Sequence, residues 1–282
     1  MEICILGTAQ DGGYPQVGCD DRCCDLAWNN ASLIRLPSCI SLLNLQTKKF
    51  WLFDVTPDIK KQMKMLDSYD CKLSGVFITH AHIGHYMGII NFGLEVMNLN
   101  KLPVYVMPRM KSFLENNSMI TQLLKHENIK LIELSNEKSL YIDDAEVKPF
   151  CVPHRNELSE TVGFQIKGKS KSAIYLPDID SWDNWEENLF ALIHSNDILY
   201  IDGTFYSNSE LKKRDISKVP HPPIISTMNL LSDLDQGLKQ KIQFIHFNHT
   251  NNVLRENSDE YHGVISNGFL LSKEMENYKI SQ

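Results

Sequence analysis

Residues 74–85 read SGVFITHAHIGH, an apolar run that ends in three histidines. The run predicts a buried strand, and on extended backbone the rings of His80 and His82 turn to the same side. His85 returns to that side if the chain turns into a helix directly after the strand. Imidazoles gathered at a strand-to-helix corner are suitable ligands for a borderline metal ion such as zinc. The stretch therefore predicts a metal site at the end of a strand.

Strand-like and helix-like runs mix along the rest of the chain. We expect strands at residues 2–6, 38–46, 50–55, 75–79, 103–107, 130–134, 146–152, 161–167, 172–176, 198–202 and 243–247, and helices after Thr56-Pro57, after His85 and at residues 110–126, 182–194 and 224–240. This mixture predicts a layered α/β (α+β) domain. Because neither a repeat nor a Pro-, Gly- or Ser-rich linker is present, residues 1–282 are predicted to form one domain, with a cysteine-rich loop at residues 18–24.

The composition is that of an ordinary globular protein, with 43% hydrophobic and 22% charged residues among 282. The 28 Lys and Arg against 35 Asp and Glu give a net charge of −7, which disfavours general nucleic-acid binding. No apolar run approaches the ~18 residues that a membrane span needs. The opening MEICILG carries an acid where a signal peptide needs basic charge. We therefore expect a cytoplasmic protein without a nucleic-acid or membrane partner.

The seven cysteines are not spaced like a disulfide framework. Cys19, Cys23 and Cys24 crowd together, and in a reducing compartment such a cluster indicates a metal site. The other four lie singly in apolar stretches and are expected to be inert small hydrophobic residues: Cys4, Cys39, Cys71 and Cys151.

The strand followed by Thr-His-x-His-x-x-His resembles the metal motif of the metallo-β-lactamase superfamily. Four later segments extend the resemblance over nearly the whole chain: Phe53-Asp54, Val152-Pro153-His154, Tyr175-Leu176-Pro177-Asp178 and Phe244-Ile245-His246. The resemblance implies a four-layer αββα sandwich with one or two metal ions at one edge. It implies one ion held by His80, His82, His154 and Asp178, and a second held by His85, His246 and the shared Asp178. Zn²⁺ is the expected ion, with Fe or Mn as alternatives.

One position departs from the superfamily pattern. The family usually has an aspartate of the second metal site where this chain has Gly84. Losing an anionic ligand weakens a cation site, because the carboxylate both neutralises and orients the ion. The sequence therefore predicts either one tight and one labile ion, or a single ion.

The opening LGTAQDGGYPQ, residues 6–16, gives a narrower resemblance. Together with the cysteine cluster it resembles the family of pyrroloquinoline quinone biosynthesis protein B. It is also similar to cyclic-phosphate phosphodiesterases encoded with phosphonate-degradation genes. The quinone-pathway family usually lacks the intact histidine set seen here, so the chain resembles a relative that carries a hydrolase-type metal site.

The phosphodiesterase resemblance also implies a structural zinc. In those relatives a histidine three residues after the last active-site histidine completes a cysteine loop, and here that residue is His249. The implied ligands are Cys19, Cys23, Cys24 and His249. Because Cys23 and Cys24 are adjacent, the alternative set is Cys19, Asp21, Cys24 and His249. Reduced thiols without a metal remain a further alternative.

Other polar residues are candidates for supporting roles. His221 stands where relatives keep a histidine near the substrate, and it is expected to bind a phosphoryl oxygen or protonate a leaving group. Asp178 is expected to bridge the ions or orient the attacking water. Asp54 and Asp202 are expected to hold the outer nitrogens of ligating imidazoles. Surface positions are expected for His126, His194, His262, Arg109 and Arg155, and core positions for Trp182 and Trp185.

These residues together predict a metal-dependent hydrolase, and the resemblance favours a phosphodiesterase acting on a small anionic substrate. The first alternative is an iron- and oxygen-dependent enzyme of the quinone-pathway type that acts on a peptide-derived substrate. The second is a non-catalytic binding protein on the same fold, because fold alone does not determine function. A homodimer is compatible with the sequence.

Overall fold

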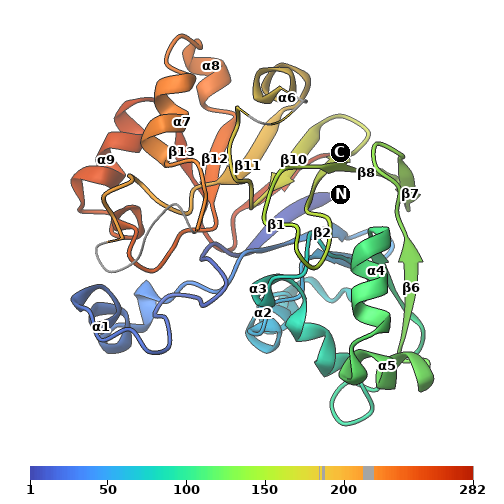
Figure 1. Cartoon of the computed structure of the whole chain (residues 1–282). Coiled ribbons are helices and arrows are strands. Elements are labelled where there is room, and N and C mark those ends of the chain that lie inside the picture. Colours follow the sequence, from blue (N-terminus) through green and yellow to red (C-terminus); the bar gives the residue numbers. More distant parts are fainter. Residues whose placement is uncertain (184, 186–187, 212–218, 282) are drawn as a thin grey trace.

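The computed structural model describes residues 1–183, 185, 188–211 and 219–281. Two mixed sheets, each of seven strands within these ranges, face each other and carry helices on their outer faces (Figure 1). The expected αββα layering of the metallo-β-lactamase sandwich is confirmed. Within the described ranges, the helices are too short or too polar to span a membrane.

The first sheet combines the amino-terminal strands with the last strand of the chain. Its order is β14 (Asn277–Lys279), β1 (Glu2–Gly7), β2 (Cys39–Asn44), β3 (Lys49–Phe53), β4 (Lys72–Phe77), β5 (Leu102–Val106) and β6 (Ile129–Glu133). Its outer face is covered by α2 (Ile59–Met65), α3 (Ile83–Tyr86), α4 (Pro108–Glu115) and α5 (Ser118–Lys125) (Figure 1). The apolar sides of these helices pack on the outward residues of the strands, such as Leu52 and Val76.

The second sheet is built from the later part of the chain. Its order is β13 (Leu270–Leu271), β12 (Ile242–Ile245), β11 (Ile198–Asp202), β10 (Ser172–Leu176), β9 (Val162–Lys167), β8 (Ala145–Cys151) and β7 (Leu140–Ile142). The elements on its outer side are α1 (Arg22–Asn29), α6 (Leu189–Ser195), α7 (Ile224–Leu230), α8 (Gln236–Lys239) and α9 (Asp259–Ser266).

Aromatic side chains join the two sheets. Phe53 of β3 and Phe77 of β4 stack at 4.8 Å between ring centroids. Phe164 of β9 meets both rings edge-on from the opposite sheet, at 5.4 and 5.6 Å. All three side chains are buried. Because successive residues of a strand point to opposite faces, the neighbours Leu52 and Val76 face the helices instead.

Strand direction decides where the polar residues gather. In the first sheet β1 and β3 are both antiparallel to β2, and β3 is parallel to β4. Strands β1, β3 and β4 therefore run in the same direction. In the second sheet β8 and β10 are both antiparallel to β9, and β10, β11 and β12 are parallel. The carboxyl ends of each set lie at one edge of its sheet. The segments that follow these ends are therefore brought together.

The expected helix boundaries were wrong in four places. The single helices expected at 110–126 and 224–240 are each two helices, because Asn117 and Asp235 accept backbone N–H groups and start a new helix at those points. The helix expected at 182–194 begins only at Leu189, after the cap Asn188, and residues 184 and 186–187 lie outside the described ranges. The helix expected after His85 begins before it, at Ile83, whereas the helix expected after Thr56-Pro57 does follow that pair and begins at Ile59.

The cysteine-rich segment 18–24 is not entirely a loop. Helix α1 begins at Arg22, so Cys23 and Cys24 occupy its first turn. Asp21 precedes the helix in extended conformation and is exposed.

We expect Phe164→Ala to reduce the free energy of unfolding by about 3–5 kcal/mol, because it leaves a cavity against Phe53 and Phe77. Urea unfolding followed by circular dichroism measures the change. Val17→Ala is the matched control, since Val17 is 85% exposed and should change stability by less than about 0.5 kcal/mol. A loss of similar size in both variants would contradict the role given to Phe164.

Candidate metal centre

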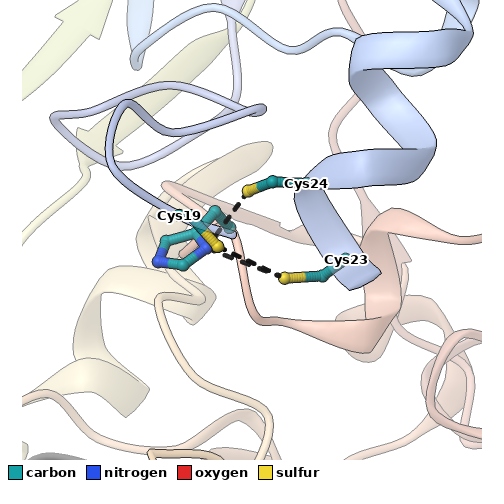
Figure 2. A group of neighbouring side chains, drawn as sticks. Cys19, Cys23 and Cys24 are labelled. Atoms are coloured by element: carbon teal, nitrogen blue, oxygen red, sulfur yellow. Dashed lines mark hydrogen bonds between the residues drawn. The ribbon is translucent and has the colours of Figure 1, made fainter. Parts of the chain in front are cut away.

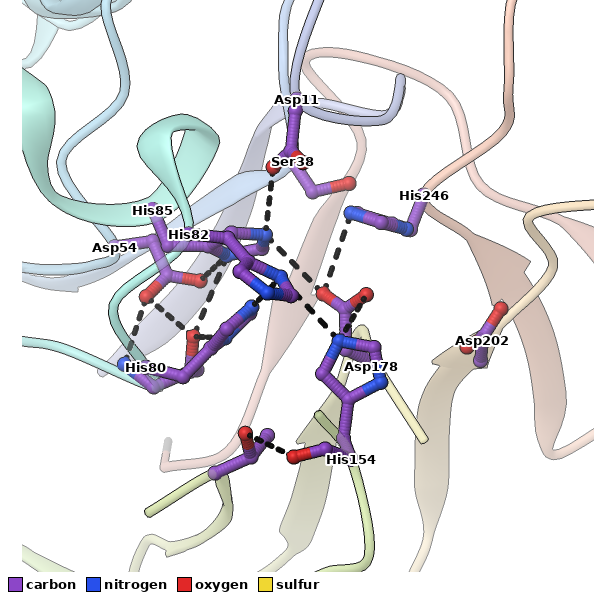
Figure 3. A network of polar contacts seen from close by, with 12 residues as sticks. Asp11, Ser38, Asp54, His80, His82, His85, His154, Asp178, Asp202 and His246 are labelled. Carbon is purple, nitrogen blue, oxygen red and sulfur yellow. Dashed lines mark hydrogen bonds and ion pairs between the residues drawn. The ribbon is translucent and has the colours of Figure 1, made fainter. Parts of the chain in front are cut away.

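Three imidazoles from two sheets face one point. His80 and His82 follow β4, and His154 follows β8 (Figure 3). His82 Nδ1 lies 2.8 Å from His80 Nε2 and 3.4 Å from His154 Nε2. Two nitrogens bound tetrahedrally to one zinc ion would lie about 3.4 Å apart. The three nitrogens are therefore close enough together to bind a common ion, with His80 and His82 nearer to each other than two bound ligands would be.

A second group forms around Asp178, which follows β10. Its Oδ2 lies 3.1 Å from His85 Nε2 and 3.2 Å from His246 Nε2. Its Oδ1 lies 3.6 Å from His154 Nε2, so the carboxylate stands between the two groups of imidazoles (Figure 3). Asp11, which the sequence analysis did not consider, places Oδ1 3.3 Å from His85 Nε2.

The outer nitrogen of four of these rings is held by an oxygen atom. The pairs are His80 Nδ1 with Thr79 Oγ1, His85 Nδ1 with Asp54 Oδ2, His154 Nδ1 with Asp180 Oδ1, and His246 Nδ1 with Thr204 Oγ1, at 2.7–2.9 Å. Such contacts fix the ring and leave the inner nitrogen to bind a cation. Asp54 has the role expected for it, whereas Asp180 and the two threonines were missed.

Asp54 is itself rigidly held. Its Oδ1 accepts hydrogen bonds from the backbone N–H and the hydroxyl of Thr79, both at 2.9 Å. Its Oδ2 accepts a hydrogen bond from the Tyr175 hydroxyl at 3.1 Å. The residue has a left-handed backbone with φ of 69°, which aspartate tolerates better than most residues. The His85 ring is therefore oriented by an anchored carboxylate.

The electrostatics of the site suit a cation. Burial lowers the pKa of His82 to about 4 and that of His80 well below its usual value, so both rings are neutral at pH 7. Burial would raise the pKa of Asp178, but His246 and His85 hold it well below its usual value. Asp178 is therefore an anion surrounded by imidazoles.

His221 adjoins the same carboxylate. Its Nδ1 lies 2.6 Å from Asp202 Oδ2 and 3.9 Å from Asp178 Oδ1, and its ring is buried. Burial would lower its pKa, but Asp202 raises it. Asp202 thus holds a histidine as expected, although that histidine is His221 rather than an expected metal ligand. His154, Asp178 and His221 form one of the groups with the spacing of metal ligands.

Cys19, Cys23 and Cys24 lie close together (Figure 2), and His249 belongs to the same cluster. Cys19 Sγ lies 3.9 Å from Cys23 Sγ, and His249 Nδ1 lies 3.9 Å from Cys23 Sγ and 3.4 Å from Cys24 Sγ. Tetrahedral zinc with Zn–S bonds near 2.3 Å keeps its sulfur ligands about 3.8 Å apart. The structure thus brings together the first of the two sets considered, and Asp21 lies before the helix at the surface.

The remaining candidates lie mostly where they were expected. His126, His194 and His262 are exposed. Trp182 and Trp185 are half-buried and pack against the core of the second sheet. Arg109 holds a neighbouring loop by donating to the Asn156 carbonyl at 2.6 Å. Arg155 is exposed and lines a cavity of about 200 Å³ beside His80 and His82.

Two facing mixed sheets with outer helices and a His/Asp cluster at one edge define the metallo-β-lactamase class of fold. The family model described as "Beta-lactamase superfamily domain" matches residues 51–247, and the chain belongs to this family.

Individual relatives refine this assignment. Coenzyme PQQ synthesis protein B of Methylorubrum extorquens (strain PA1) is 24% identical to this chain, covering 96% of it and 97% of the relative. The Zn²⁺-bound PqqB structure from Methylobacterium extorquens has a TM-score of 0.85 at 22% identity. The match covers 99% of this chain and 100% of the PqqB chain. A diphosphatase of the PhnP family has a TM-score of 0.69 at 19% identity. The match covers 98% of this chain and 96% of the diphosphatase chain. The resemblance found from the sequence is confirmed, and the two structures establish the shared fold.

If the thiol cluster holds a structural zinc, Cys19→Ala should remove one zinc per chain and lower the melting temperature by roughly 4 °C or more, equivalent to about 2 kcal/mol. Calorimetry and elemental analysis of the same sample measure both effects. Cys71→Ala is the control, because Cys71 lies half-buried far along the sequence from this cluster. Unchanged zinc content in Cys19→Ala would contradict the prediction.

Proposed function

We propose that this chain is a metal-dependent hydrolase that cleaves phosphodiester or diphosphate bonds in a small anionic substrate. The observation that carries the proposal is the convergence of His80, His82, His154 and Asp178 on one point at ligand spacing. Their donor set of nitrogen and oxygen suits Zn²⁺ and also Fe or Mn. The similarity of fold to a PhnP-family diphosphatase supports phosphoryl chemistry.

A divalent cation held by His80, His82, His154 and Asp178 would lower the pKa of a bound water to about 7 and would present a positive charge to the substrate. Asp178, an anion buried between the histidine groups, would orient the attacking water. His221, whose buried ring adjoins Asp178, would donate a proton to the leaving oxygen. Asp202 supports this role because a carboxylate at 2.6 Å favours the protonated ring.

Substrate charge follows from the surroundings of the site. The chain has a net charge of −7, so general attraction does not bring in an anion. The exposed guanidinium of Arg155 lines the cavity beside His82 and offers a paired donor for a phosphate group. A small anion is thus recognised locally, by the cation and Arg155, rather than by an extended basic surface.

We expect His82→Ala to reduce phosphodiesterase activity by at least about 10³-fold, because it removes an ion ligand, while the fold is kept. A panel of 4-nitrophenyl phosphodiesters, cyclic nucleotides and diphosphates measures activity, and circular dichroism measures folding. His126→Ala, at an exposed position, is the control and should match the wild type. Wild-type protein loaded with zinc, iron or manganese that cleaves none of these compounds would refute the proposal.

His221→Asn should lower kcat by about 10²–10⁴-fold for substrates with alkoxide leaving groups, but much less for 4-nitrophenyl esters. The difference arises because 4-nitrophenolate leaves without a proton, whereas an alkoxide needs one. Steady-state kinetics on a matched pair of esters measures it. An equal loss on both substrates would assign His221 a structural role instead of proton donation.

A second candidate function is an iron- and oxygen-dependent reaction of the quinone-pathway type. It is favoured by the similarity to coenzyme PQQ synthesis protein B over 96% of the chain. Elemental analysis of protein purified without added metal, combined with oxygen uptake in the presence of tyrosine-containing peptides, distinguishes the two. Iron with oxygen consumption supports this candidate, and zinc with phosphodiester cleavage supports the hydrolase.

A further inference from the structure

Asp11 occupies the space into which a side chain at position 84 would point. A Cβ atom at Gly84 would lie 2.2 Å from Asp11 Oδ1 and 2.5 Å from Asp11 Cα. Such contacts are far inside van der Waals separation, and the second involves the backbone, so rotating the Asp11 side chain does not relieve it. Glycine at position 84 is therefore what allows the Asp11 segment to approach helix α3.

Backbone hydrogen bonds fix this segment beside His246. The Phe247 N–H donates to the Thr8 carbonyl, and the Gln10 N–H donates to the Phe247 carbonyl, both at 2.8 Å. The Gly13 N–H donates to the Gln10 carbonyl at 2.7 Å and closes a turn around Asp11. The backbone beside Asp11 is thus held in place by Phe247, the residue that directly follows His246.

Four buried side-chain atoms at this place approach one another at 3.1–3.3 Å, but none of them makes a hydrogen bond of acceptable geometry in the part of the chain that the structure describes. They are Asp11 Oδ1, His85 Nε2, Asp178 Oδ2 and His246 Nε2. Such atoms are uncommon in folded proteins and indicate a partner of another kind. Asp11, His85 and His246 form a group whose ligand atoms all lie within 4.8 Å of one another. In Figure 3, Asp11, His85, His246 and Asp178 surround a common space.

The charge of this group matches a divalent cation. Asp11 and Asp178 bring two negative charges, and the rings of His85 and His246 bring two lone pairs. We infer that Asp11 supplies the carboxylate ligand that residue 84 lacks, so that Asp11, His85, Asp178 and His246 hold the second ion. With this assignment the second site would have two carboxylate and two imidazole ligands, whereas Gly84 alone predicts a weakened site. This assignment rests on the proposed metal-dependent function.

Asp11→Asn tests the assignment, because it keeps the side-chain shape and removes the charge. Both proteins are dialysed against a series of zinc buffers, and bound zinc is measured by elemental analysis. We expect the wild type to bind one more zinc per chain than the variant, with second-site affinity at least about tenfold lower in the variant. Diffraction at the zinc absorption edge should show that Asp11→Asn lacks the ion between His85 and His246. The ion at His80, His82 and His154 should be retained in the variant.

Asp70→Asn is the matched control, since Asp70 is exposed in a turn and its left-handed backbone accepts asparagine. Gly84→Ala provides an independent variant that keeps the Asp11 carboxylate but displaces its segment, and it should also lose the second zinc. Gly237→Ala, on the distant helix α8, controls for the added methyl group.

Equal zinc content and affinity in wild type and Asp11→Asn would overturn the assignment, as would a second ion that lies away from Asp11. A wild type with no ion between His85 and His246 at saturating zinc would also overturn it. Wild-type protein that binds both ions but cleaves no phosphodiester or diphosphate would refute the proposed function and leave the assignment standing.

Discussion

The attraction between the Asp178 carboxylate and the imidazoles around it is the interaction on which the site depends. Burying a carboxylate costs several kcal/mol unless an opposite charge lies close to it. Here three ring nitrogens, from His85, His154 and His246, lie within 3.6 Å of its oxygens. Without a metal ion, a proton on His85 supplies positive charge, and Asp54 and Asp178 raise the pKa of that ring well above its usual value despite burial. A divalent cation would supply more positive charge beside Asp178 than this one proton does.

The chain has two groups of candidate metal ligands, and the ligand atoms of the two groups differ in chemical softness. The cluster of Cys19, Cys23, Cys24 and His249 is rich in sulfur and would favour soft or borderline ions such as Zn²⁺. The group around Asp178 contains only nitrogen and oxygen donors and would suit a wider range of ions. Burial raises the pKa of the Cys24 thiol to about 12, so a zinc ion there has to displace a proton. The two sites therefore respond differently to metal supply.

The sequence was sufficient to predict the layered fold and the histidines, because short-range patterns determine both. His80, His82 and His85 lie within one strand-to-helix corner, and the resemblance to the metallo-β-lactamase superfamily pointed to His154, Asp178 and His246. Asp11 could not be predicted in this way. Its role depends on the pairing of residues 8–10 with Phe247 and on the missing Cβ at Gly84, which are contacts between distant segments. The helix breaks at Asn117 and Asp235 were missed because their side-chain caps interrupt continuous apolar patterns.

The ligand groups are divided between the two halves of the sandwich. His80, His82, His85 and Asp11 lie in segments that follow strands of the first sheet, with His85 in helix α3. His154, Asp178 and His246 lie in segments that follow strands of the second sheet. Each ion would therefore cross-link the two sheets at one end of the interface formed by Phe53, Phe77 and Phe164. Its binding energy would resist any sliding or parting of the layers. Removal of the metal would consequently weaken the packing of the two sheets against each other, in addition to abolishing the proposed hydrolysis.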